Sequence, residues 1–365
     1  MEIVMTTQRT LKKQIRDRMD RTGERYTTAR SHVLKATPSH LRIGGQQGDL
    51  ASVTNALNAA GITGPDGLPL TEAQVFGLAG GVGFLYGVFR YDTGPTMTIT
   101  TRNTSMPDTF LDQLWKTEGL NCIVSTTGGL KKARTELERV LNHDGRALCS
   151  VGAGKLGYLG LPESESAMYP IVVGVVAMDG GDYLVDDRSP QLHRVDANQF
   201  ADARAVLRSA KQRMVAVRSS DLDWPTAVSA AVEIGARRYN TPPVKQFAAN
   251  IGSAGLEKWH RLLTDQKDRM GWSKVFSDGN HAGLGFARTF ECIEHAYTAK
   301  HASRPLYAEF LEWAAELTGN PSYAEAAGHA TVSGQHWATI SHLAAASDPN
   351  VAEAALAIEK RTELL

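Results

Sequence analysis

The sequence FGLAGGVGFLYG at residues 76–87 is the stretch that decides the fold. The segment before it starts with Thr71 as a helix cap, so a helix leads into the glycines. A dinucleotide-binding fingerprint needs GxGxxG directly after a strand, whereas Gly81, Gly83 and Gly87 give GxGxxxG after a helix. No Gly-Lys-Ser/Thr motif of a phosphate-binding loop occurs in the chain. The run therefore indicates either glycines that allow close backbone approach or positive φ at a helix exit, or a backbone-lined ligand site.

The segments around the glycine run alternate between helical and extended patterns. Apolar residues at helical spacing predict helices, and alternating or continuous apolar runs predict strands. The expected helices are 50–61, the segment that Thr71 begins, 108–118, 130–142 and 198–211, and the expected strands are 97–101, 121–126, 146–153, 170–179, 182–187 and 191–196. Because helices come first and a strand meander follows, the pattern predicts an α+β layout rather than a repeated βαβ winding.

Beyond residue 219 the sequence shows only helical periodicity. The expected helices there are 226–239, 244–264, 283–300, 303–318, 321–345 and 350–362, and a narrow amphipathic helix is expected near the start at 9–22. A length of 365 residues fits more than one domain. We therefore expect a basic helical extension (1–42), an α+β domain (43–218) and an all-α domain (219–365). The apolar, Trp-rich helical domain could supply a homodimer interface.

Charge is unevenly spread along a chain whose net charge is zero. Residues 1–42 hold 10 Lys/Arg against 4 Asp/Glu, a net of +6. This basic arm could bind RNA or another polyanion, form a solvated helix face, or dock on the acidic remainder of the chain. Three scattered cysteines without a CxxC pair, no signal-peptide pattern and no apolar run of membrane-spanning length favour a protein of the reducing cytosol, with no membrane contact.

Cysteines and histidines, which often carry chemistry, show no motif. Cys122 and Cys149 fall in expected strands and Cys292 falls inside an expected helix, so none lies at a helix N-terminus, where a thiolate nucleophile is usually activated. All three are interpreted as buried structural residues. The helical half contains many histidines, which are either surface and interface residues or part of a metal site with Glu291 or Glu294: His260, His281, His295, His301, His329, His336 and His342. Without an HExxH pair, we expect neither a metal nor a cofactor.

Asp186, Asp187 and Arg188 end a strand beside a turn. Adjacent side chains on a strand face opposite sides, so the two carboxylates do not form an acid–base dyad. One of them could orient a base or pair with Arg188, or the group could form a solvated turn.

The order of features from 47 to 204 resembles the N-terminal domain of the butirosin biosynthesis protein H family, an acyltransferase domain with a papain-like fold. The resemblance rests on the helix that ends at Gly61, on LTEAQVFGLAGGVGFLYG (70–87), on the strand and helix that follow through Leu114, on the long apolar strand with Leu156 and Tyr158, and on IVVGVVAMDGGDYLVDDRS (171–189). The second half resembles the helical domain that often follows in such proteins, through GLEKWHRLL (255–263), RPLYAEFLEWAAEL (304–317) and QHWATISHLA (335–344).

The resemblance implies a Cys–His–Asp triad, but two of its positions are changed here. In the family a Cys opens the first helix, a His starts the strand before the turn, and an Asp at the end of the next strand orients the His. In this sequence the Cys position falls near Gly48, the His position falls at 169–171 without a histidine, and only Asp187 matches. The family's covalent mechanism, in which the Cys takes an acyl group from a carrier-protein thioester and passes it to an amine, cannot run on these residues.

Two hypotheses follow. The first is an acyl- or aminoacyltransferase-like enzyme of bacterial natural-product or antibiotic biosynthesis, in which the amine attacks an activated donor directly. The second is a pseudoenzyme that binds a small metabolite or scaffolds a biosynthetic partner; a metal-dependent chemistry is the remaining alternative. The basic arm could hold an acyl carrier protein or an aminoacyl-tRNA, and the acceptor would be a small-molecule amine. The candidate catalytic residues are Asp187, Tyr169, Tyr158, Gln47 and Asp49, with Gln47 or Gln46 as the oxyanion donor, and the candidate substrate-binding residues are Gly48, Gly81, Gly83, Phe84, Tyr86 and Arg188.

Overall fold

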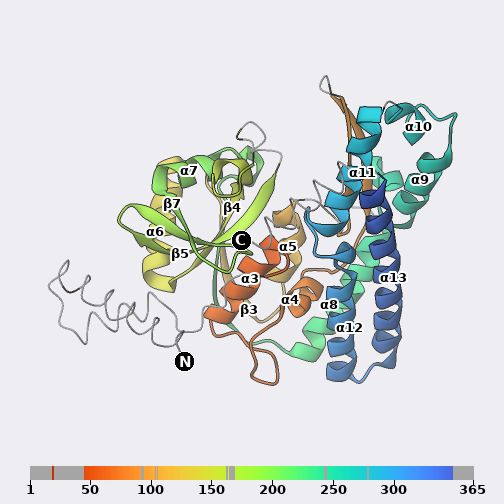
Figure 1. Cartoon of the computed structure of the whole chain (residues 1–365). Coiled ribbons are helices and arrows are strands. Elements are labelled where there is room, and N and C mark those ends of the chain that lie inside the picture. The colour runs from red at the N-terminus through yellow and green to blue at the C-terminus, as the bar shows by residue number, and fades with distance from the viewer. Residues whose placement is uncertain are drawn as a thin grey trace, which may run out of the picture.

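A six-stranded antiparallel sheet forms one half of the molecule (Figure 1). The computed structural model describes residues 19, 45–91, 94–102, 104, 106–161, 163, 169–241, 245–277 and 279–347. The sheet has the order β3-β8-β4-β5-β6-β7, from β3 (Leu120–Ser125), β8 (Met214–Ser220), β4 (Ala147–Gly152), β5 (Pro170–Asp179), β6 (Asp182–Asp186) and β7 (His193–Asp196). Strands β4 to β7 form the meander that the sequence predicts.

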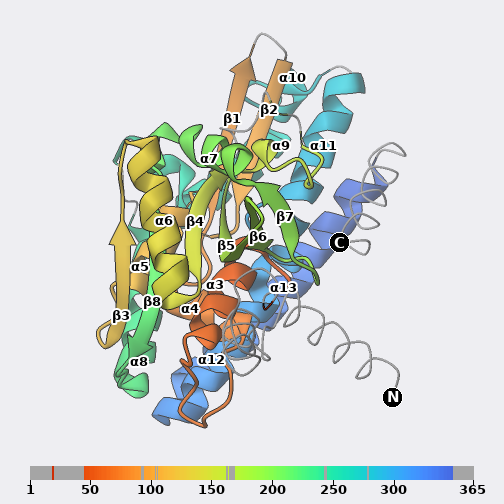
Figure 2. The same ribbon diagram turned by 90° about the vertical axis from the view of Figure 1, so that its left-hand side faces the viewer.

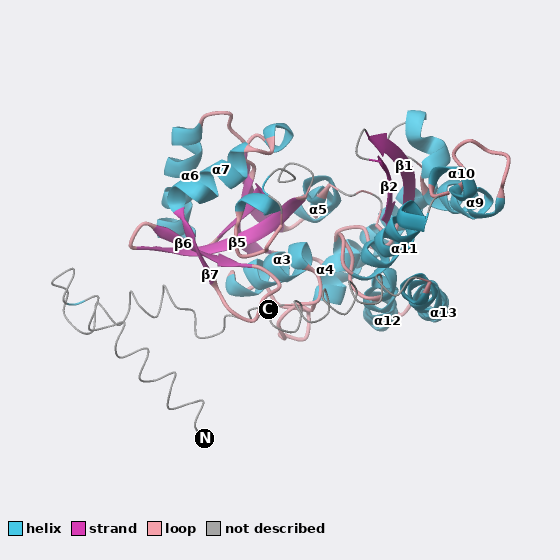
Figure 3. Ribbon diagram, turned by 45° about the horizontal axis from the view of Figure 1, so that its top comes forward, coloured by secondary structure: helices cyan, strands magenta, loops and turns pink. Residues whose placement is uncertain are grey.

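Helices cover both faces of this sheet (Figures 2 and 3). On one face lie α6 (Leu130–Asp144) and α7 (Ala197–Ala205), which bury an apolar core with the strands. On the other face lie α3 (Gly48–Ala59), α4 (Glu72–Leu78) and α5 (Pro107–Trp115), and their core continues into the helical half. Because α3 shares this core with both the sheet and the helical half, its N-terminus lies between the two halves.

The helical half is built around its last two helices, α12 (Arg304–Thr318) and α13 (Pro321–Ala346), which pack against each other as an antiparallel pair. The helices before them are α8 (Trp224–Asn240), α9 (Gly252–Thr264), α10 (Trp272–Val275) and α11 (Gly279–Glu294). A two-stranded hairpin of β1 (Leu85–Tyr91) and β2 (Gly94–Thr100) packs on α9 and α11 and shares an aromatic core with them (Figure 1). The hairpin therefore lies with the helices although it precedes the sheet in the chain. No helix among the described residues is both long enough and apolar enough to traverse a membrane.

The glycine run lets the chain turn from α4 into the hairpin at very close range. Thr71 forms the expected capping box with Gln74 at the start of α4. At the other end Gly81 has φ +64°, and a Cβ there would lie 2.3 Å from the ring of Tyr307. A Cβ on Gly77 would lie 2.1 Å from the ring of Phe310. These glycines therefore allow α4 to pack directly against α12, as the close-approach interpretation predicts.

The structure differs from the sequence prediction at several elements. Strand β1 follows the glycines directly, β8 lies between β3 and β4, and the short helix α10 precedes α11; none of these was expected. The expected helices 198–211 and 283–300 end earlier, at Ala205 and Glu294. The expected helix 244–264 is broken, because Gly252 adopts φ +60° at the start of α9. Apart from residue 19, the basic extension 1–42 and the expected helices 9–22 and 350–362 lie outside the described residues.

Candidate functional site

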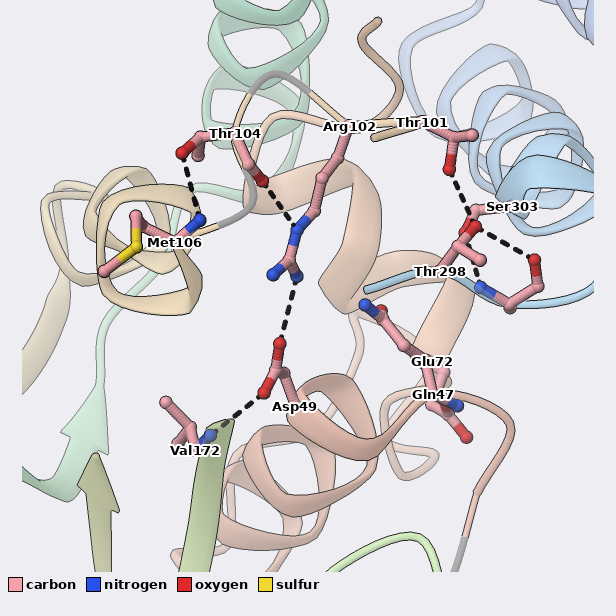
Figure 4. Close-up of polar contacts among 11 residues, drawn as sticks. Gln47, Asp49, Glu72, Thr101, Arg102, Thr104, Met106, Val172, Thr298 and Ser303 are labelled. Carbon is pink, nitrogen blue, oxygen red and sulfur yellow. Dashed lines mark hydrogen bonds and ion pairs between the residues drawn. The ribbon is translucent and has the colours of Figure 1, made fainter. Parts of the chain in front are cut away.

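The start of α3 is fixed by a hydrogen bond to the sheet and by a buried ion pair with the segment after β2 (Figure 4). The Asp49 carboxylate accepts a hydrogen bond from Val172 N–H at 2.9 Å and pairs with Arg102 Nη1 at 3.1 Å. The two side chains are 4% and 1% exposed, and Arg102 Nε donates to the Thr104 carbonyl at 2.9 Å. Both oxygens of Asp49 are thus engaged in holding α3, β5 and the segment after β2 together.

Gln47, the residue that precedes α3, brings a buried amide to the helix N-terminus. Its side chain is 3% exposed and makes no capping hydrogen bond, and among the described residues neither its Nε2 nor its Oε1 has a hydrogen-bond partner. The backbone N–H groups of Gln46 and Gln47 donate to the two oxygens of Glu72, at 2.8 and 3.1 Å, which fixes the loop. The first N–H groups of any helix lack intrahelical acceptors and carry partial positive charge. With Gln47, they form a set of donors suited to an oxyanion.

The side chains of His193, Asp187 and Tyr158 meet at the end of β6. His193 Nε2 lies 3.7 Å from Asp187 Oδ1, and the His193 ring stacks on Tyr158 with centroids 3.8 Å apart. Asp187 Oδ1 also accepts the Ser189 N–H at 2.6 Å. Burial, and then the charge of Asp187, hold the pKa of the Tyr158 phenol well above its usual value of 10, so it stays protonated. Asp187 and Asp186 are 5% and 0% exposed, which excludes the solvated turn.

The loop before α3 brings this cluster close to the helix N-terminus. Gly45 N–H donates to the Arg188 carbonyl at 3.0 Å, directly after Asp187. Burial lowers the pKa of the Arg188 guanidinium, and the charge of Asp187 opposes this effect. No hydrogen bond or ion pair holds the Arg188 side chain within the described part of the chain. The predicted pairing of Asp187 with Arg188 is thus an electrostatic proximity without a direct ion pair.

The helical half contributes a second set of polar side chains to this region. The turn after α11 packs on the segment after β2, because Thr298 and Thr101 share a hydrogen bond at 2.7 Å and the Arg102 guanidinium lies 5.5 Å from the centre of the Tyr297 ring. Burial raises the pKa of Tyr297, and the Asp49 carboxylate adds to this. His295 Nε2 has no partner, and burial followed by the charges of Arg188 and Lys300 lowers the pKa of His295 to about 4. His295 is therefore neutral at pH 7.

No nucleophile stands at the N-terminus of α3. Gly48 occupies the first helical position, and Ser52, the next hydroxyl, is fully buried and donates to the Asp186 carbonyl at 3.1 Å. Burial raises the pKa of all three thiols, and Cys149 and Cys292 are fully buried. The cysteines are buried or half-buried, as expected of structural residues. The described residues contain no group of three or more His, Cys, Asp or Glu side chains that could hold a metal ion.

The predicted site residues divide into two groups in space. Gln47, Gly48 and Asp49 lie at the start of α3, and Tyr169 lies beside the first residue of β5. The glycine-run candidates lie elsewhere: Gly83 donates to the Thr101 carbonyl at 3.0 Å, and the side chains of Phe84 and Tyr86 are fully buried in the aromatic core of the helical half.

Sequence reasoning did not place His193 or His295 at this site, and it considered His295 only as a surface, interface or metal-site residue. The signal for His193 was its place on the strand that pairs with β6, where His193 lies opposite Val185. A side chain on that strand can reach Asp187 from the C-terminal side of the turn. His295 gave no such signal, because only tertiary packing brings α11 to the site.

These features define a papain-like α+β domain, with the N-terminus of its central helix against the ends of β5 and β6, followed by a helical domain. Family comparison agrees: the family described as "Butirosin biosynthesis protein H, N-terminal" matches residues 51–188, and a domain of unknown function (DUF4872) matches residues 198–364. Residues 51–188 therefore form an N-terminal domain of the butirosin biosynthesis protein H family, and the DUF4872 domain follows it. No curated protein matched the chain.

Proposed function

We propose that this protein transfers an acyl or aminoacyl group from an activated donor to an amine by direct attack, without an acyl-enzyme intermediate. The observation that carries the proposal is the buried Gln47 amide, which has no partner at the N-terminus of α3. A buried amide normally finds a partner, and leaving one unpaired costs about 1–3 kcal/mol. An unpaired donor at a helix N-terminus supports a role in binding a ligand oxygen that becomes negative.

The chemistry needs no nucleophile from the protein. The amine nitrogen attacks the carbonyl carbon of a thioester or ester, a C–N bond forms, and the carbonyl oxygen becomes an oxyanion beside Gln47 and the first N–H groups of α3. When the intermediate collapses, the C–S or C–O bond breaks and the thiol or alcohol leaves. Binding both reactants on the protein at the same time supplies the remaining rate enhancement.

A base must accept the proton that the amine loses, and His193 is the residue we assign to that role. Asp187 is its carboxylate partner, as an orienting acid is in the triad arrangement. The proton then passes from His193 to the leaving thiolate or alkoxide, which balances the reaction. Asp49 is assigned a positioning role, since both of its oxygens are engaged. The protonated phenol of Tyr158 orients the His193 ring by stacking.

The test combines the purified chain with an aminoacyl N-acetylcysteamine thioester and a small diamine. Mass spectrometry should detect the amide at a rate above the uncatalysed one, and the intact protein should gain no acyl mass at any time. An acyl adduct on the chain would refute direct attack. No amide above background would leave the family member as a binding protein that scaffolds a partner.

A further inference from the structure

A cavity of about 390 Å³, open to solvent, is bordered by Gly45 and Gln46 of the loop that precedes α3. The start of α3, the start of α4 and the side of α12 line the rest of it. Its polar lining includes Glu72 from α4, Glu309 from α12 and Thr54 from α3. The volume is in the range of small-ligand sites.

The cavity has the electrostatics of a cation site. No Lys, Arg or His is among the side chains that line it, and neither Glu72 nor Glu309 forms a salt bridge within the described part of the chain. Burial raises the pKa of Glu72, and the nearby charge of Glu309 raises it further. A bound cation would relieve both effects.

Thr54 provides an independent sign of a ligand. The residue is 5% exposed and lines the cavity, and its Oγ1 has no hydrogen-bond partner in the part of the chain that the structure describes. Buried hydroxyls in folded proteins are nearly always paired. With the two carboxylates that line the same cavity, this hydroxyl oxygen completes a set of acceptors for the N–H groups of an ammonium ion.

We propose that this cavity binds a protonated amino group of the acceptor molecule, an inference that rests on the proposed function. An ammonium held by two carboxylates has no lone pair and cannot attack the donor. The reacting amine must therefore be a second amino group of the same molecule, so the acceptor class is a compact polar compound with at least two amino groups. Glu72 also connects the two sites, because it accepts the N–H groups of Gln46 and Gln47.

The test is binding of 1,3-diaminopropane to the full chain in the absence of any acyl donor, with 1,3-propanediol as the uncharged control. Thermal shift and isothermal titration should show that the diamine binds and stabilises the protein and that the diol does not. Glu309→Lys should weaken diamine binding at least tenfold. Glu312→Lys, the same charge change at an exposed position of α12 that does not line the cavity, should leave binding unchanged.

Thr54→Val separates a ligand-binding hydroxyl from a purely structural one. The substitution should raise the melting temperature of the free protein and weaken diamine binding several-fold. Three results would each overturn the inference. The first is equal binding of diamine and diol, and the second is wild-type affinity in Glu309→Lys. The third is no diamine binding by the wild type, as when a basic side chain of the chain itself fills the cavity. Diamine binding without amide formation would overturn only the proposed function.

Discussion

Replacing Gln47 by Leu should make the protein more stable and less active. The side chain is 3% exposed and neither amide atom is paired, so the folded state bears the cost of an unsatisfied polar group. That cost is about 1–3 kcal/mol, and Leu has a similar size and no polar atom. We expect the free energy of unfolding to rise by about 1 kcal/mol. Loss of one oxyanion donor should at the same time lower the transfer rate about 10²- to 10³-fold.

Both effects can be measured on the same protein preparation. Urea unfolding followed by tryptophan fluorescence gives the stability change, and single-turnover amide formation gives the rate. Gln335→Leu is the matched control, because this side chain is exposed on α13 and does not line the cavity, and the single-turnover rate should not change. A Gln47→Leu variant that is less stable than the wild type and equally fast would show that the amide has a structural partner and no part in the reaction.

Three further predictions concern the frame of the site. Asp49→Ala should lower the free energy of unfolding, measured in urea, by about 3–5 kcal/mol, because it leaves the buried Arg102 unpaired. Replacing Arg102 by Met as well should recover part of this loss. A loss below about 1 kcal/mol in Asp49→Ala would contradict a buried pair. Burial raises the pKa of Asp186 to about 6 from 3.8, so the folded chain keeps a proton there that the unfolded chain releases. Stability should therefore fall by about 3 kcal/mol at most as pH rises from about 4 to 6, and Asp186→Asn should lack this fall; parallel pH curves would contradict it. Gly81→Ala should lower stability by at least about 2 kcal/mol, through its positive φ and the clash with Tyr307, whereas Gly128→Ala, with open space around it, should be nearly neutral in the same thermal unfolding assay.

The parts of the fold that local patterns determine could be predicted from the sequence. The capping residue Thr71 and the meander from β4 to β7 follow from capping and strand periodicity, which act within a few residues. Strand β8 could not be predicted in the same way. It pairs with β3 and β4, which lie far earlier in the chain, and β-sheet position depends on such partners more than on propensity.

The candidate site shows the same division. Gln47 and Asp187 could be found from the sequence because each lies at the end of one element that a family pattern marks. The partners of these groups come from distant segments: Arg102 pairs with Asp49, and His193, to which we assign the role of the base, lies beside Asp187. A pattern that asks for a histidine at the start of β5 does not detect one on β7, two strands further along the sheet.

The absence of a nucleophile at the start of α3 and the presence of the cavity with Glu72 and Glu309 both support direct attack. A covalent acyltransferase meets its donor and acceptor in turn, so one cleft can serve both. Direct attack requires both substrates to be bound at once, because no acyl group is stored on the protein between them. The loop at 45–47 takes part in both sites of the proposal: it carries the Gln47 amide to the N-terminus of α3, and its Gly45 and Gln46 line the cavity with Glu72 and Glu309. Since Glu72 accepts the N–H groups of this loop, an amine bound beside it stabilises the loop conformation that holds Gln47 in place. The family scaffold without its Cys and His therefore fits an enzyme that forms a ternary complex.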